Sequence, residues 1–572
     1  MSQKKKQQAA PRAAVNKTVP SPIPTANEPK AFAIPFAWAW LGIATLLMYV
    51  PSFFLKFTEL DDSIFIHDFA AYNEDPGSLI ESFKRGVFGP LDPYYRPLFL
   101  DSMVLNSRIN INGQEILGYH IVNVLFHIIC VLLIYRFFVK LGIKDLTAFI
   151  LSLLFAVHPV LAQAVAWIPG RNDTLLGIFT LSFFIFCVDY VKSGKKPFLI
   201  LSGFFLLLAY FTKETAVFAA PAAFILIVFV LQKKWNDRNN IIQYGVWMAC
   251  FLVWFIARAN ATVQPGTPFG QVLTGAVHHL PVLLQYTGKI FLPFNLSVFP
   301  IQQDTVNYYG IAAIVLLAAL LFLNKERNMR MVLAGSGIFL LFLVPALLIP
   351  DDLNQQTFEH RLYLPMIGIL LVLPQTILFK NALKPKKLLA GGVLVCGLLA
   401  FINYNHQQKF ADPLTFWASA EATSPHSAYA VMMLAAREPD TKVSDTLFRR
   451  AYKLNPKEKY LNFYMAEMLQ KEDSVAQSEK YLLAEKSISN FYKVDFMLAR
   501  VAMERKDYAA AITDLENAQK REPGNTMAKN NLLLLYLQTN QRDKAIGEVR
   551  LMQQTGVAVP PQIRAQLGIT NP

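Results

Sequence analysis

Four basic side chains, all in connections between apolar runs, could together bind an anion. They are Arg96, Arg171, Lys213 and Arg361. Arginine suits phosphate because its planar guanidinium group donates paired hydrogen bonds to two oxygen atoms. If these side chains converge at one surface of a membrane, we expect them to bind the phosphate group of a lipid.

Two adjacent carboxylates, Asp61 and Asp62, lie in the segment LDDSIF after the first apolar run. Beside a bound phosphate, one of them could act as a general base and take a proton from a hydroxyl group. Adjacent carboxylates are, however, more often part of a solvated loop or a helix cap. For similar reasons Lys213 and Glu214 could be a local ion pair, and His158 could mark the end of a span.

The histidines and cysteines show no pattern typical of a metal site. His278 and His279 are adjacent, but no carboxylate or cysteine lies at a diagnostic spacing from them. The cysteines all lie within apolar runs, at Cys130, Cys187, Cys250 and Cys396. We therefore predict neither a disulfide framework nor a zinc site, and we interpret the two histidines as structural.

The composition is that of a membrane protein with several spans. Of the 572 residues, 54% are hydrophobic and 16% are charged, whereas soluble domains have about 25% charged residues. Apolar runs near the crossing length of about 20 residues recur along the chain. The net charge of +14 does not indicate nucleic-acid binding, because the basic residues gather in short loops and in the N-terminal arm. Eleven spans are predicted, near 32–55, 116–139, 145–160, 173–191, 197–212, 215–232, 241–259, 309–324, 331–349, 362–379 and 388–404.

The basic residues of the loops predict an orientation. They lie in alternate connections, all of which fall inside if the N-terminal arm, 1–31, is a disordered cytoplasmic segment. This holds only if the apolar, proline-containing stretch 271–298 does not cross the membrane, so we predict a re-entrant or surface-lying hairpin there. The membrane domain is then 32–404, and its largest outer loop is 56–115.

Residues 405–572 are predicted to form a separate helical domain outside the membrane. Ala511 and Ala545 are 34 residues apart, as are Leu498 and Leu532. This period, with small residues where paired helices approach closely, is typical of tetratricopeptide repeats. The predicted fold class is therefore all-α: a membrane domain of about eleven spans followed by an α-solenoid.

The outer motifs, in their order along the chain, resemble one family. The segments YYRPL, HPVLAQAVAWIPGRNDTLLGIF, YFTKETAV and EHRLYLPMIGILL, followed by repeats, are similar to the transmembrane and tetratricopeptide-repeat protein O-mannosyltransferases and their bacterial relatives. These enzymes belong to the GT-C class of integral membrane glycosyltransferases. The resemblance covers about 57–405, and the order of domains extends it to the C-terminus. The repeat array, which begins near 413, is shorter than in the animal members.

The resemblance implies a polyprenyl-phosphate-linked sugar as the donor and assigns roles to individual residues. The catalytic base lies in the first outer loop of such enzymes, so Asp61 and Asp62 inherit this role, with Asp62 slightly favoured. No metal ligand is assigned, and a divalent cation stays open because some GT-C relatives use one. The residues expected to bind the donor phosphate and lipid are Arg96, Arg171, Lys213, His360 and Arg361. The residues expected to support them are Tyr95, His158, Asp173, Glu214 and Tyr363.

The resemblance also explains the polar residues between two spans in the segment HPVLAQAVAWIPGRND. On this interpretation Pro159 ends the incoming helix, and Asp173 caps the outgoing helix, because carboxylates favour helix N-termini. Arg171 is then left to face the lipid phosphate, and His158 helps to line the same cavity.

The expected function is transfer of a sugar, a mannose-like hexose favoured, to Ser or Thr hydroxyls of exported proteins with inversion at the anomeric carbon. The acceptor protein or peptide would be docked by the repeats. The basic arm and the lack of a cleaved signal favour a bacterial inner membrane, with the repeats in the periplasm. The alternatives are en bloc transfer of an oligosaccharide, transfer to a glycolipid or cell-wall polymer, and a membrane scaffold that recruits partners through its repeats without catalysis.

Overall fold

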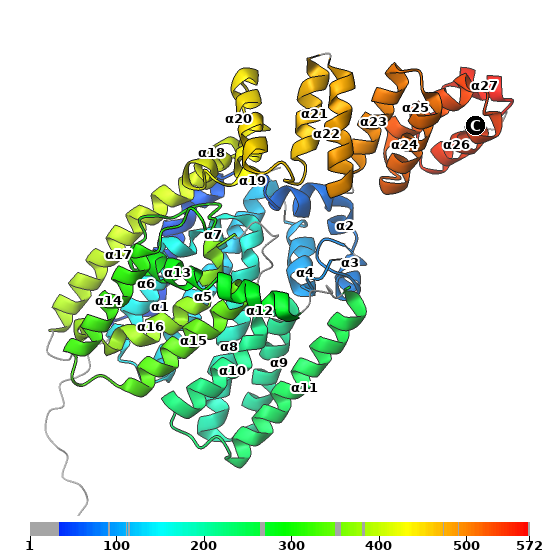
Figure 1. The fold of residues 1–572 in the computed structure, drawn as a ribbon. Coiled ribbons are helices and arrows are strands. Elements are labelled where there is room, and N and C mark those ends of the chain that lie inside the picture. The colour runs from blue at the N-terminus through cyan, green and yellow to red at the C-terminus, as the bar shows by residue number, and fades with distance from the viewer. Residues whose placement is uncertain are drawn as a thin grey trace, which may run out of the picture.

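The described residues of the computed structural model form helices joined by loops, with no strand among them. They are 34–89, 92–109, 111, 115–263, 269–348, 356–379, 384–472, 474–489 and 491–569. Figure 1 shows a bundle of long helices and, across its upper end, a row of shorter antiparallel helices that leads to the C-terminus. The predicted all-α class is confirmed.

The long helices of the bundle are apolar enough to cross a membrane. Among the described residues, six helices pass this test, and a seventh span results if a pair of helices bent by 52° is counted as one. The six are α1 with the turn that follows it (Ala37–Phe54), α5 (Glu115–Lys140), α8 (Arg171–Ser193), α11 (Arg238–Ala261), α15 (Met329–Leu347) and α17 (Pro385–Gln407). The bent pair is α6 (Asp145–Val157) and the helical segment that ends with α7 (Ala162–Ala166).

Shorter apolar helices occupy the remaining predicted spans. They are α9 (Lys196–Thr212), the segment Glu214–Val230 that contains α10 (Ala219–Ile225), α14 (Tyr308–Leu323), and the segment Pro365–Gln375 that begins with α16 (Pro365–Val372). Each of the eleven predicted runs therefore falls on an apolar helical segment. The number that cross the membrane stays a prediction, because a crossing needs about 20 residues.

Two amphipathic helices occupy the stretch predicted not to cross. They are α12 (Phe269–His278) and α13 (Pro281–Phe291). A helix of 11 residues is about 16 Å long, which is roughly half the hydrocarbon thickness of a bilayer. Their lengths agree with a hairpin at the outer surface.

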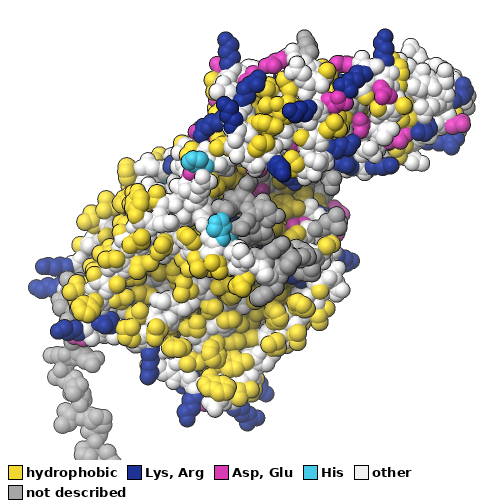
Figure 2. All heavy atoms as spheres, in the orientation of Figure 1, with side chains coloured by type: hydrophobic (Ala, Val, Ile, Leu, Met, Phe, Trp, Pro, Cys, Tyr) yellow, Lys and Arg dark blue, Asp and Glu magenta, His cyan; other side chains and the backbone are white. Residues whose placement is uncertain are grey.

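The surface of the bundle separates into an apolar belt and a charged end. Figure 2 shows hydrophobic side chains covering most of the bundle, with Lys and Arg at its lower end. A basic end is expected of a cytoplasmic face. The orientation in the membrane remains a prediction that this distribution supports.

The C-terminal body consists of paired helices whose spacing repeats. It runs from α18 (Pro413–Thr423) through α19 (Ala428–Ala435), α20 (Thr441–Leu454), α21 (Leu461–Lys471), α22 (Val475–Ile488), α23 (Tyr492–Glu504), α24 (Tyr508–Arg521), α25 (Thr526–Gln538) and α26 (Arg542–Gln554) to α27 (Pro561–Leu567). Helices α23 and α25 begin 34 residues apart, and so do α24 and α26. Ala511 and Ala545 are both buried where the pairs meet. The tetratricopeptide interpretation fits this geometry.

The first helices of this body pack on the loop that carries Asp61. The indole N–H of Trp417 in α18 donates to the Thr58 carbonyl at 3.0 Å, and Arg437 pairs with Glu59 at 2.7 Å. The backbone N–H of Lys56 donates to the carbonyl oxygen of Ala411. The C-terminal body is therefore in direct contact with the first outer loop.

Candidate active site

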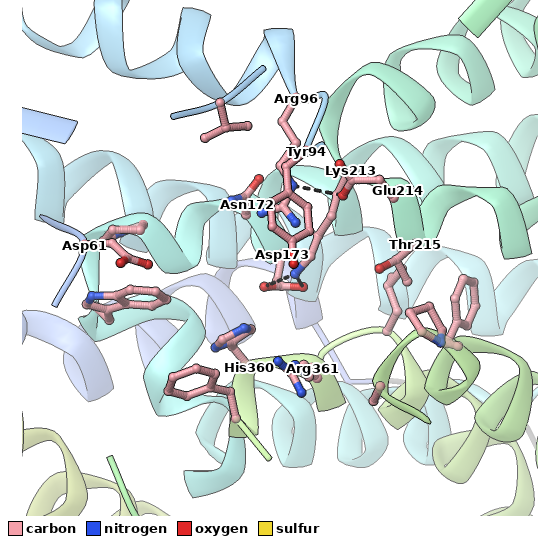
Figure 3. A pocket seen from close by; sticks show the side chains of 18 of the residues that line it. Asp61, Tyr94, Arg96, Asn172, Asp173, Lys213, Glu214, Thr215, His360 and Arg361 are labelled. Carbon is pink, nitrogen blue, oxygen red and sulfur yellow. Dashed lines mark hydrogen bonds and ion pairs between the residues drawn. The ribbon is translucent and has the colours of Figure 1, made fainter. Parts of the chain in front are cut away.

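A cavity of about 370 Å³ brings together residues from four separate outer segments of the chain. Its predicted members are Asp61, Arg96, Asp173, Lys213, Glu214, His360 and Arg361. They come from the first outer loop, the start of α8, the end of α9 and the loop before α16. Figure 3 shows these side chains directed toward a common space.

Two ion pairs form the charged floor of this cavity. Arg96 Nε donates to Glu214 at 2.9 Å, and Lys213 Nζ lies 2.7 and 2.8 Å from the two carboxylate oxygens of Asp173. The second oxygen of Glu214 accepts from the backbone N–H of Tyr95 at 2.9 Å. Each carboxylate thus orients one cation toward the cavity, as Figure 3 shows.

The paired cations keep hydrogen-bond donors for a ligand. A guanidinium group has five N–H donors and an ammonium group has three. Arg96 uses its Nε for Glu214, which leaves its two terminal nitrogens, and Lys213 uses two short contacts to Asp173. Arg361 lines the same cavity and binds the carbonyl oxygen of Gln356 at 2.6 Å. An incoming phosphate group can therefore be bound without breaking either ion pair.

The two adjacent aspartates have different surroundings, and only Asp61 lines the cavity. Asp62 is only 1% exposed and does not line the cavity. It accepts from the backbone N–H and the hydroxyl of Thr58, at 2.6 and 3.0 Å, and from the N–H of Ser63 at 3.1 Å. It stabilises the turn, whereas Asp61 lines the cavity. The preference for Asp62 is corrected accordingly.

The surroundings of Asp61 favour its protonated form more than those of an ordinary aspartate do. Burial and the neighbouring Asp62 charge raise the pKa of Asp61 to about 6, while Arg96 acts in the opposite direction. A carboxylate with this pKa is ionised at pH 7 and binds a proton more tightly than an ordinary aspartate.

Arg171 does not face the cavity, in contrast to its predicted role. It is 0% exposed, and its guanidinium donates to Asn123 Oδ1 and the Tyr119 carbonyl, both at 2.9 Å, and to the Ser102 carbonyl at 3.3 Å. These acceptors lie on α5 and α4 (Pro97–Asn106). Arg171 therefore ties the start of α8 to two other helices, and its donors are not available to a donor phosphate.

Three supporting residues are also structural rather than cavity-lining. His158 Nε2 bonds to the Ile290 carbonyl at 2.9 Å, and Tyr363 bonds to His127 at 2.7 Å. The hydroxyl of Tyr95 donates to the carbonyl oxygen of Phe83 at 3.0 Å. All three are buried. They support the helix ends from which the lining residues project.

His360 lines the cavity as a neutral group. Burial, with the nearby charges of Lys213, Arg361 and Arg96, holds the pKa of His360 well below its ordinary value. Its Nδ1 and its backbone N–H both lie 3.2 Å from Gln163 Oε1. It can therefore take part in hydrogen bonding but adds no positive charge for a phosphate.

A sealed ionic cluster behind His360 was not expected from the sequence. Glu359 pairs with Lys289 at 2.8 Å and with His406 at 3.1 Å, and it accepts from the Ser297 N–H at 2.8 Å. Burial raises the pKa of Glu359, but the opposing effects of Lys289 and His406 are larger and lower it to about 2. This cluster joins α13, the loop of His360 and the end of α17.

Further lining residues were not predicted. Tyr94, Trp167, Asn172 and Thr215 are polar or aromatic, and the end of α15 contributes part of an apolar wall. The other apolar lining residues are Phe65, Val87, Phe88, Pro169, Phe342, Pro345, Ala346, Leu348, Phe358 and Leu364. A charged floor beside an apolar wall at the end of a membrane helix suits an amphiphile with an anionic head group. The sequence signal for Asn172 and Trp167 was their position in the motif AWIPGRND.

The described residues include no group of three His, Cys, Asp or Glu side chains that could hold a metal ion. His279 Nδ1 lies 2.8 Å from the amide oxygen of Gln302.

Comparisons with known proteins bear on what this cavity does. Residues 102–258 match the family model "Dolichyl-phosphate-mannose-protein mannosyltransferase". The chain is 25% identical over 414 residues to the Protein O-mannosyl-transferase F38B6.6 of Caenorhabditis elegans, covering 67% of this chain and 57% of that protein. It is 33% identical over 270 residues to the human Protein O-mannosyl-transferase TMTC3, covering 47% of this chain and 24% of that protein. The chain spans between about a quarter and about half the length of these two relatives.

A solved structure of an Archaeoglobus fulgidus oligosaccharyltransferase, tethered to an acceptor peptide, also aligns with the chain. The alignment covers 72% of this chain and 58% of that chain, with 12% identity and a TM-score of 0.38. That score is too low to define a shared fold. The family model and the curated relatives confirm the resemblance to membrane O-mannosyltransferases that the outer motifs indicated.

Proposed function

We propose that this protein transfers a sugar from a polyprenyl-phosphate donor to Ser or Thr hydroxyls of exported proteins, with a mannose-like hexose favoured. The observation that carries the proposal is the convergence of Asp61, Arg96, Lys213 and Arg361 in one cavity with an apolar wall. The similarity to Protein O-mannosyl-transferases supports the choice of sugar and acceptor. The protein would lie in a bacterial inner membrane with the repeats in the periplasm.

The donor binds with its phosphate on the cations and its lipid tail along the apolar wall. Arg96 and Lys213 offer the donors that remain after pairing with Glu214 and Asp173. Fixed cations at the leaving group stabilise the charge that develops as the bond to the sugar breaks. Because they are already oriented by their carboxylates, little reorganisation is needed during the reaction.

The acceptor hydroxyl reacts at the opposite side of the sugar. Asp61 takes the hydroxyl proton, the oxygen forms a bond to the anomeric carbon, and the bond from that carbon to the phosphate oxygen breaks. The electron pair leaves with the polyprenyl phosphate, and the anomeric configuration is inverted. The first helices of the C-terminal body contact the loop of Asp61, so an acceptor docked on the repeats would reach this carboxylate.

The test is a transfer assay with the purified full-length protein in lipid nanodiscs. A polyprenyl-phosphate hexose or a lipid-linked oligosaccharide is supplied as the donor, and a Ser/Thr-containing peptide or a glycolipid as the acceptor. The product is measured by mass spectrometry and its anomeric configuration by NMR. We expect addition of one hexose with inverted configuration. Transfer only of a preassembled oligosaccharide, transfer only to a lipid, or no turnover with any hexose donor would contradict the proposal.

A further inference from the structure

Two buried polar atoms line the cavity without any hydrogen-bond partner. Among the described residues, the indole Nε1 of Trp167 and the Oδ1 of Asn172 have none. Trp167 is 6% exposed and Asn172 is 7% exposed, and both line the cavity that contains Asp61 and Arg96. They are one donor and one acceptor, and they belong to two residues that line the same cavity.

An unpaired buried donor or acceptor costs a protein stability, because it loses water without gaining a partner. At the edge of a cavity, a ligand is one source of the missing bond. The two ion pairs of the cavity floor already satisfy Asp173 and Glu214. Trp167 and Asn172 are therefore uncharged lining residues that each have a buried polar atom without a partner, whereas the unused donors of Arg96 and Lys213 are on charged groups.

The neighbouring Arg171 anchors the backbone from which these two side chains project. Its three hydrogen bonds to α4 and α5 anchor the start of α8. Asn123, which accepts from Arg171, also donates to the carbonyl oxygens of Trp167 and Ile168 at 3.3 and 3.2 Å. The backbone on both sides of the motif is thus held rigidly, as recognition of a polar ligand requires.

Asn172 lies between the proposed base and the proposed phosphate site. Figure 3 shows it between Asp61 on one side and Lys213 and Arg96 on the other. In a donor whose phosphate is on the cations and whose anomeric carbon faces Asp61, this space is that of the sugar ring. Neutral hydrogen-bonding groups suit sugar hydroxyls, which both donate and accept.

We propose that Trp167 and Asn172 form the sugar-recognition subsite, in which the Trp167 N–H donates to one hydroxyl of the hexose and the Asn172 amide oxygen accepts from another. This inference rests on the proposed function, because it takes a lipid-linked hexose as the ligand. It adds two specificity-determining residues that contact neither the phosphate nor the acceptor. Trp167→Phe and Asn172→Ala then lose one hydrogen bond each, with Phe keeping the aromatic packing against Phe358 and His360.

The experiment measures binding in nanodiscs of three probes to full-length protein: a polyprenyl-phosphate hexose, the same donor lacking single ring hydroxyls, and polyprenyl phosphate without sugar. We expect Trp167→Phe and Asn172→Ala to weaken binding of the complete hexose donor by about ten- to a hundredfold. For each variant, one deoxy donor should bind as tightly as it does to the wild type. Binding of sugar-free polyprenyl phosphate should be unchanged.

The matched control is Trp247→Phe. Trp247 is also buried with an unpaired Nε1, but it lies on α11 and does not line the cavity. This variant should bind all probes as the wild type does. The proposal is overturned if Trp167→Phe and Asn172→Ala bind the hexose donor normally, or if they weaken binding of every probe equally. If the variants lose affinity only for the complete hexose donor, but the wild-type protein transfers no sugar, the subsite is supported and the proposed transferase activity is contradicted. The failure of one proposal can therefore be distinguished from the failure of the other.

Discussion

The molecule contains two buried groups of ionic residues that differ in what they leave unused. In the cavity, Arg96 pairs with Glu214 and Lys213 pairs with Asp173, with side chains between 8% and 26% exposed. In the sealed cluster, Lys289 and Glu359 are both 0% exposed and His406 is 2% exposed. The cavity cations keep donors for a ligand, whereas the sealed cluster is enclosed by protein.

The unused donors distinguish the candidate binding site from the sealed cluster, whose role is structural. A buried charge with one missing partner is strongly destabilising, so the sealed cluster must stay paired. It holds the loop of His360 against α13 and α17. The cavity pairs orient two cations toward the cavity, where we propose that the donor phosphate binds. The presence of charged residues between apolar runs therefore does not identify a site, but their access to a common cavity does.

The largest expected effect distinguishes the two adjacent aspartates. Asp61→Asn should reduce kcat/KM for hexose transfer by about 10² to 10⁴, since it removes the general base. Asp62→Asn should have a smaller effect, because the amide oxygen can still accept from the N–H and the hydroxyl of Thr58, and only the bond from the Ser63 N–H is lost. Transfer assays on equal amounts of folded protein measure both. Full activity of Asp61→Asn, or a greater loss for Asp62→Asn, would reverse the assignment.

The second prediction concerns the free energy of unfolding when the carboxylate of the sealed cluster is removed. Glu359→Gln leaves the Lys289 charge buried without a counter-ion and should lower the free energy of unfolding by about 3–5 kcal/mol. Glu214→Gln, at the partly exposed cavity pair, should lower it by less than about 1 kcal/mol. Denaturant unfolding in detergent gives both values. An equal decrease in the free energy of unfolding for Glu359→Gln and Glu214→Gln would show that the sealed cluster contributes no more to stability than the cavity pair does.

The third prediction concerns the unused donors of Arg96. Arg96→Lys keeps the charge but has too few donors in the right geometry to bind Glu214 and a phosphate together. We expect binding of polyprenyl phosphate to weaken by about tenfold, the loss of roughly one hydrogen bond to a charged group. The control is Arg327→Lys, in the loop between α14 and α15. Similar affinities of Arg96→Lys and the wild type would mean that Arg96 does not contact the phosphate.

The smallest expected effect is a shift in pH dependence. The base must be ionised, so kcat/KM should fall about tenfold per pH unit below the pKa of Asp61, which burial and Asp62 raise to about 6. Arg96 lowers this pKa, so Arg96→Gln should move the acidic limb to higher pH. If kcat/KM of Arg96→Gln falls at the same pH as that of the wild type, or at a lower pH, the result contradicts the electrostatic effect of Arg96 on Asp61.

The sequence predicted the helical architecture well because hydrophobic periodicity and length depend on local residues. The positions of the apolar runs, the 34-residue spacing of α23 to α26, and the four outer motifs that meet in one cavity all follow from such patterns. The convergence of Arg96, Lys213 and Arg361 was predictable because loops between alternate spans must lie on one side of a membrane.

The sequence could not distinguish neighbouring residues whose side chains point in opposite directions. Asp61 and Asp62 differ only in how the turn at Thr58 directs them, and Arg171 and Asn172 differ only in their place around the first turn of α8. An arginine in a polar motif suggests phosphate binding, yet Arg171 is satisfied by Asn123 and backbone carbonyl groups. The pairing of Glu359 with Lys289 and His406 joins segments far apart in sequence, and no local pattern indicates it.

A structure of the full-length protein with bound polyprenyl phosphate tests the central claim most directly. The cavity account predicts the phosphate group within hydrogen-bond distance of Arg96, Lys213 and Arg361, with the isoprenoid chain along Phe342 and Leu348 and with the Lys289–Glu359–His406 cluster unchanged. A phosphate group bound outside this cavity, with these three cations still contacting only protein, would contradict it.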